Sequence, residues 1–271
     1  MSANKALSPT LLVKGNQFKL SVPFESITQL PVRKEVRRVM SVDLGINCTA
    51  TCAIVDADGT VVARRFLHPA ADIDRRDKGL AAVSRKASLT MGESGKLSEG
   101  FCRGIYRKVG CRNRDMSNRL AGKLVKFARE HGAEAIVFEY LKHYRPKAGG
   151  RSGSTLRQRF HGWLHRALVK KVKEMTAEAE IRTEFVAPAG TSMYAYDGSG
   201  LLWRDQKNRT LVVFANGKHY NADLIAAYNI GARFLFRVLH PGLRIETGCA
   251  WGKSSPAQPR IPVTLSTLCA A

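Results

Sequence analysis

The sequence lacks long apolar runs, since no stretch reaches the ~18 residues that a membrane-spanning helix needs. Residues 1–14 also lack the apolar stretch of a signal peptide. We therefore expect a protein that neither spans a membrane nor has a membrane as its partner.

Closely spaced cysteine pairs of the CxxC type are also absent, although the chain holds six cysteines. Without a secretory signal, these cysteines are predicted to be reduced thiols rather than a disulfide framework. Two of them are four residues apart in a predicted strand and would face the same way, which favours core packing over metal binding. The six are Cys48, Cys52, Cys102, Cys111, Cys249 and Cys269.

Acidic residues are scarce, because 22 Asp and Glu stand against 44 Lys and Arg, a formal net charge of +22. An excess of this size predicts a polyanionic partner. Nucleic acid is favoured over an anionic membrane because no basic amphipathic helix with an aromatic face stands out. The length of 271 residues suits one large domain, or a domain with a small appendage.

Three of the few acids lie in short motifs that are far apart in the chain. Asp43 follows an apolar strand-like run, Glu139 ends another, and Asp223 begins a helical segment capped by Asn221. Three carboxylates brought together by folding can hold divalent metal for phosphodiester chemistry, because Mg²⁺ prefers oxygen ligands. Each acid alone also has a structural explanation, as a turn residue, an ion-pair partner of Lys142 or a helix-dipole residue. Together, these three acids are the candidate catalytic and metal-binding residues.

The periodicity of apolar residues and the turn signals predict an alternation of strands and helices. The expected elements are a hairpin within 10–24, strands at 39–43, 49–55 and 60–66, a loop-rich or mobile helical insertion at 69–100, a helix at 115–131, a strand at 135–140, a helix at 156–180, a strand at 181–186 and a helix at 221–239. This order predicts an α/β fold: a ribonuclease-H-like, mixed five-stranded sheet flanked by helices. The three acids would then meet on one sheet.

These motifs resemble the RuvC-type nuclease domain of TnpB transposon-encoded proteins and their relatives, the type V CRISPR effectors. Residues 43–47 (DLGIN) are similar to the first family motif, residues 138–139 (FE) to the second, and residues 221–230 (NADLIAAYNI) to the third, which is the most specific. The resemblance implies an RNA-guided, metal-dependent DNA endonuclease module. It implies two Mg²⁺ ions, with Mn²⁺ as an alternative, held by the three acids in a two-metal mechanism.

Two departures from the family pattern shape the expected domains. The four-cysteine zinc ribbon of the family has no counterpart, since residues 191–220 contain no cysteine, so no zinc is expected. Most of the N-terminal half is also missing, which makes a separate polypeptide supplying that half a further candidate partner. The expected division is an N-terminal β segment resembling the end of a wedge domain at 1–35, a nuclease core with a basic helical insertion at 36–190, a degenerate ribbon-like insertion at 191–220, the final helix at 221–240 and a tail at 241–271.

A basic segment, residues 103–147, holds twelve Lys and Arg against four acids. The resemblance implies that it flanks a guide RNA paired with target DNA, neutralising the backbone while base pairing supplies specificity. It also implies a prokaryotic, cytoplasmic and nucleoid-associated protein. The expected nucleic-acid-binding residues are Arg103, Arg107, Lys108, Arg112, Arg114, Arg119, Lys142, Arg145, Arg157 and Arg159.

Three other functions stay open on the sequence. A nucleic-acid-binding protein that does not cleave would keep the basic surface, and the lost cysteines and missing N-terminal half favour it. An actin-like or sugar-kinase ATPase also opens with an Asp-x-Gly strand, but the charge of +22 and the lack of further glycine loops argue against it. A Holliday-junction resolvase would share the sheet and the metals and act as a dimer.

Overall fold

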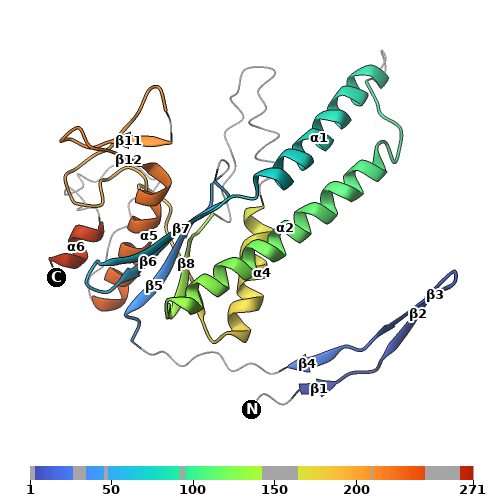
Figure 1. Ribbon diagram of the computed structural model, residues 1–271, viewed down its shortest axis with the longest axis horizontal. Coiled ribbons are helices and arrows are strands. Elements are labelled where there is room, and N and C mark those ends of the chain that lie inside the picture. Colours follow the sequence, from blue (N-terminus) through green and yellow to red (C-terminus); the bar gives the residue numbers. More distant parts are fainter. Residues whose placement is uncertain are drawn as a thin grey trace, which may run out of the picture.

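A five-stranded mixed sheet forms the centre of the computed structural model (Figure 1). The structure describes residues 4–26, 35–45, 48–91, 95–141, 164–208, 210–241 and 263–270. The strand order across the sheet is β7 (Val61–Leu67), β6 (Ala50–Asp56), β5 (Arg38–Asp43), β8 (Ala135–Glu139) and β9 (Arg182–Val186). Strands β5, β6 and β7 form an antiparallel meander, and β8 and β9 continue the sheet in parallel with β5. The predicted α/β fold with a mixed sheet flanked by helices is confirmed.

Helices cover both faces of this sheet, which explains why its central strands are apolar on both sides. On one face lie α2 (Arg103–Glu130) and α4 (His165–Glu178); on the other lies α5 (Ala222–Leu239). Met40 and Val42 of β5 pack toward α2 and α4, whereas Val39 packs toward α5. Because side chains alternate along a strand, Asp43 shares the α5 face with Val39.

The helix α5 approaches the sheet closely, and small residues make this approach feasible. Ala222, Ala226 and Ala227 are buried, as their size predicts. Gly231, which the sequence did not single out, makes the tightest contact. A Cβ atom on it would lie 3.0 Å from Val55 Cγ2 and 3.1 Å from the Ser41 hydroxyl oxygen. The α5 helix could not carry a larger residue there without displacing the sheet.

A long antiparallel helical pair extends from the sheet (Figure 1). The segment at 69–100, expected to be a loop-rich or mobile helical insertion, forms a regular helix over most of its length, α1 (Ala70–Thr90), packed on α2. The helical alternative is therefore confirmed for this part of the segment. Helix α2 also begins at Arg103 rather than at Asp115. A salt bridge of 2.6 Å from Arg119 to Asp72 joins the two helices.

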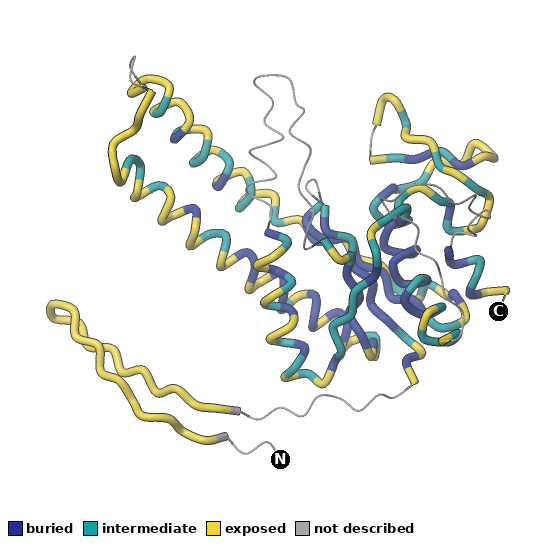
Figure 2. Tube along the Cα trace, turned by 180° about the vertical axis from the view of Figure 1, so that it is seen from behind, coloured by how far each residue is buried: buried dark blue, intermediate teal, exposed yellow. Residues whose placement is uncertain are grey.

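The N-terminal residues form a narrow β ribbon, as predicted for residues 10–24. Strand β2 (Thr10–Lys14) pairs with β3 (Gln17–Ser21) around Gly15, which has a φ of 58°. Short strands β1 (Asn4–Ala6) and β4 (Phe24–Ser26) pair at its base. Residues 5–25 of the ribbon are all exposed (Figure 2), including apolar side chains such as Phe18 at 73%.

The chain between Glu139 and Asp223 adds a small three-stranded sheet. Its strands are β10 (Trp203–Arg204), β11 (Leu211–Val213) and β12 (His219–Asn221), in antiparallel order. A short helix that the sequence did not predict, α6 (Leu265–Cys269), packs against α5 through Leu265 and Leu268. The predicted helix at 156–180 is described only from His165.

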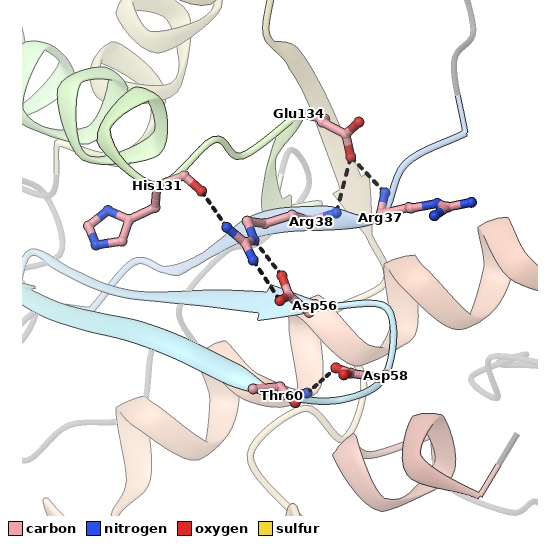
Figure 3. A network of polar contacts seen from close by, with 7 residues as sticks. All are labelled: Arg37, Arg38, Asp56, Asp58, Thr60, His131 and Glu134. Carbon is pink, nitrogen blue, oxygen red and sulfur yellow. Dashed lines mark hydrogen bonds and ion pairs between the residues drawn. The ribbon is translucent and has the colours of Figure 1, made fainter.

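A polar network fastens the end of the sheet away from the three acids (Figure 3). The Arg38 guanidinium donates to both carboxylate oxygens of Asp56, at 2.5 and 2.8 Å, and to the backbone oxygen of His131 at 3.1 Å. The Glu134 carboxylate accepts the backbone N–H groups of Arg37 and Arg38. The network therefore joins the start of β5, the end of β6 and the turn before β8.

Candidate active site

Two of the candidate acids leave the sheet at the same edge. Asp43 is the last residue of β5 and Glu139 the last residue of β8. These strands are parallel neighbours, and Val42 is paired with Phe138 in their register. Both acids therefore follow the paired positions directly and lie side by side on the α5 face.

The third acid reaches this edge from the helix. Asn221 caps α5, because its side-chain oxygen accepts the backbone N–H of Leu224 at 3.0 Å. Asp223 lies in the first helical turn, next to the sheet face that α5 covers. The predicted cap and the predicted end of this helix at Leu239 are both confirmed.

The three carboxylates interact electrostatically. Burial raises the pKa of Asp43 well above its usual range, and the negative charges of Glu139 and Asp223 raise it further. Burial also raises the pKa of Glu139 and the pKa of Asp223. A site lined by carboxylate oxygens fits a hard divalent cation. As they stand, no three Asp, Glu, His or Cys side chains among the described residues are close enough to hold one ion.

A hydrogen-bonded loop orients Glu139. The Thr191 hydroxyl donates to the Glu139 carboxylate at 2.5 Å and lowers the pKa of that group against the effect of burial. Asn229 of α5 is buried and donates to the backbone oxygens of Thr191 and Tyr194, at 2.8 and 2.9 Å. Asn229 therefore fixes the loop that carries Thr191, a role that its helical pattern alone did not reveal.

Two arginines add positive charge beside the acids. The Arg233 guanidinium donates to the backbone oxygens of Ala187 and Ala189 and lowers the pKa of Glu139. Arg204 of β10 lowers the pKa of Asp43 and the pKa of Asp223. Sequence reasoning missed both residues, because only the folded insertion brings Arg204 near the acids and only the packing of α5 brings Arg233 near Glu139.

The described part of the basic segment lies on α2. Four of its predicted nucleic-acid-binding side chains are exposed: Arg103, Arg107, Lys108 and Arg114. A fifth, Arg112, is half-buried and donates to the backbone oxygen of Arg75. The sixth, Arg119, is exposed and pairs with Asp72 and Asp115. Lys142, Arg145, Arg157 and Arg159 lie outside the described residues, as do Ile46 and Asn47 of the first motif.

Comparisons with known proteins agree with this architecture. No family model matches the chain. It is 24% identical over 250 residues to a TnpB-like protein of Aquifex aeolicus (strain VF5), covering 87% of this chain and 80% of that protein. Its fold is similar to that of Cas12f1 in a complex with sgRNA and target DNA, with a TM-score of 0.54 and 16% identity. It is also similar to CasPhi-2 (Cas12j) bound to crRNA, with a TM-score of 0.51 and 12% identity.

The coverage of the two solved structures is unequal. The alignments cover 85% and 72% of this chain, but only 66% of the Cas12f1 chain and 47% of the CasPhi-2 chain. The chain is thus similar in sequence to a TnpB-like protein and in fold to Cas12 effectors, so the predicted resemblance to the TnpB and type V CRISPR effector family is confirmed. Within the described residues, no helix has both the length and the apolarity to cross a membrane.

Proposed function

We propose that this chain is the metal-dependent DNA endonuclease module of an RNA-guided nuclease. The observation that carries the proposal is the shared edge of the sheet, where Asp43 and Glu139 end neighbouring parallel strands and where desolvation, followed by the charges of Glu139 and Asp223, raises the pKa of Asp43. These three acids would hold two Mg²⁺ ions, or Mn²⁺. When bound, the ions would activate water and stabilise the leaving oxygen of the phosphodiester.

The remaining residues of the site have supporting roles in this proposal. Thr191 donates to the Glu139 carboxylate, which favours its ionised form and orients it toward the site. Arg204 supplies positive charge beside Asp43 and Asp223, where a phosphate would approach. The exposed basic residues of α2 would neutralise the backbone of a guide–target duplex without reading its sequence.

The relatives support nucleic-acid partners for the module. The similar Cas12f1 structure contains sgRNA and target DNA, and the CasPhi-2 structure contains crRNA. We infer a guide RNA and a target DNA for this chain as well, acting in the cytoplasm of a prokaryotic cell at the nucleoid. The separate polypeptide expected from the sequence has no support from these comparisons.

The strand order also supports a ribonuclease-H-like assignment of the sheet. We propose a core at 36–190 completed by the α5 segment at 221–240, with a wedge-like N-terminal segment at 1–35 and a C-terminal tail at 241–271. The residues 191–220 would be a ribbon-like insertion that has lost its metal. This division follows the β ribbon, the central sheet and the small three-stranded sheet.

A cleavage assay tests the proposal. The chain, purified with its accompanying RNA, is incubated with labelled single- and double-stranded DNA and Mg²⁺. We expect cleavage that Asp43→Ala abolishes and that Asp74→Ala, a change at an exposed acid of α1, leaves intact. Tight binding without cleavage in all three proteins would instead support the alternative, a nucleic-acid-binding protein that does not cut.

A further inference from the structure

A hollow of about 490 Å³ lies between the edge strand β7 and the insertion. Its walls come from the edge strand β7, from the insertion, from α5 and from α6. None of the side chains that line it is acidic, so the hollow does not repel an anion. The lining residues are Val61, Val62, Ala63, Arg64, Tyr196, Tyr220, Tyr228 and Leu265.

Three tyrosines give this hollow an aromatic wall. The ring centroid of Tyr196 lies 5.4 Å from that of Tyr220 and 5.5 Å from that of Tyr228. The hydroxyl groups of Tyr220 and Tyr228 share a hydrogen bond of 3.1 Å. Rings held in this way need little further ordering when a planar ligand stacks on them, and nucleobases of any sequence stack well on aromatic side chains.

Two cations stand on the same wall. The Arg64 guanidinium donates to the Tyr220 hydroxyl at 3.1 Å, and the Lys218 ammonium donates to the Tyr196 hydroxyl at 2.7 Å. Both side chains are exposed. A guanidinium has five N–H donors and an ammonium three, so each keeps donors for a phosphate after these bonds are made.

The position of the hollow connects it with the three acids. Tyr220 precedes Asp223 by three residues, and Tyr228 follows it by five, which is about 7.5 Å along the axis of α5. Asp223 and Tyr228 therefore share the first turns of α5, and the proposal below places both along one bound strand.

We propose that this tyrosine hollow binds one unpaired nucleobase of a single nucleic-acid strand, with Arg64 and Lys218 contacting the adjacent phosphates. The hollow thus deepens the proposed function by holding the strand next to the acids that would cut it. The required chemistry, a base and a phosphate, is common to single-stranded DNA and RNA.

The test measures binding in the Asp43→Ala protein without divalent metal, so that it does not depend on cleavage. The probes are fluorescent DNA and RNA oligonucleotides of equal length and sequence, and an abasic DNA strand that keeps only the phosphates. We expect the protein to prefer the strands that carry bases. Tyr220→Ala should weaken their binding roughly 5- to 100-fold, the range for losing one stacked base, and leave the abasic strand unchanged.

A matched pair of arginine variants tests the phosphate contact. Arg64→Gln should make the fall of log affinity with log salt concentration less steep, by about 0.7 in slope for single strands. Arg65→Gln makes the same charge change on the other face of β7, where that guanidinium lies 4.6 Å from the Phe127 ring centroid, and should change the slope less. Both positions are exposed, so both variants should fold.

The outcomes separate the hollow from the nuclease. Tighter binding of a base-carrying strand than of the abasic strand, lost in Tyr220→Ala, supports the proposal. Whether the DNA or the RNA strand binds more tightly identifies the source of the base. Equal binding of base-carrying and abasic strands by the parent protein overturns it, as does an equal effect of the two arginine variants. Loss of cleavage in the metal assay with the base preference intact would count against the proposed function alone.

Discussion

Replacing Thr191 by valine should make the candidate site require a higher pH. The Thr191 hydroxyl has one proton and two acceptors in reach, Glu139 Oε1 at 2.5 Å and the Pro188 backbone oxygen at 3.1 Å. The shorter contact to the carboxylate takes the proton. A hydrogen bond to a charged group contributes about 1.5–3 kcal/mol. Thr191→Val therefore removes roughly a ten- to hundredfold preference for the ionised form of Glu139.

Metal binding to Glu139 requires the ionised carboxylate, so its acidic limit should move to higher pH in Thr191→Val. The assay is Mn²⁺ affinity measured by calorimetry from acid to neutral pH, with DNA cleavage followed over the same range. Thr191→Ser keeps the hydroxyl and serves as the control. Coinciding profiles of Thr191→Val and the parent protein, or an equal shift in Thr191→Ser, would refute the assigned role of this hydroxyl.

Three further predictions concern stability and charge. The pKa of Asp43 is raised on folding, so between the unfolded-state and folded-state pKa values the folded protein binds more protons than the unfolded chain, and stability falls as pH rises through that window. Asp43→Asn should therefore raise the Tm of the metal-free protein at neutral pH, by about 2–4 °C for each kcal/mol recovered. An unchanged Tm would contradict this prediction. Gly231→Ala should lower the free energy of unfolding by about 1–3 kcal/mol through overpacking against the sheet. Gly110→Ala, where the added Cβ meets open space, should stabilise α2 by up to about 1 kcal/mol. Equal midpoints of the two variants in denaturant unfolding would count against the close approach of α5 to the sheet. Replacing Arg103 and Arg107 by Gln should reduce the salt slope of duplex binding by about 0.9 for each arginine, and an unaltered slope would place the duplex elsewhere.

Local signals made the part of the fold that carries the three candidate acids predictable. The strands that end in Asp43 and Glu139 are short apolar runs, and burial on both faces of a sheet produces such runs. The start of α5 at Asn221 follows from the capping chemistry of one side chain. Because these signals act within a few residues, they could be read from the sequence without knowledge of the fold.

Contacts between distant residues could not be read in this way. Thr191 and Glu139 are separated by 52 positions, and nothing in either segment marks them as partners. Helix α1 was expected only as one of two alternatives, without bounds, because only Arg76 and Val83 are buried in it, so its apolar stripe is weak and its packing on α2 sustains it. Gly231 carries no periodic signal at all, since its importance lies in an absent side chain.

The insertion between the second and third acids has a bearing on the site that does not depend on cysteine. Its small core contains Val212 and Phe214 of the insertion together with Ala222 and Ile225 of α5. Strand β12 runs directly into the capping residue of that helix. Packing in the insertion therefore fixes where α5 begins, and with it the position of Asp223. Aromatic contacts supply this rigidity, with the Lys218 ammonium 5.2 to 5.4 Å from the centroids of three rings. An insertion that has no cysteines can thus still hold the third carboxylate against the sheet, which is the condition that metal-dependent cleavage by this chain requires.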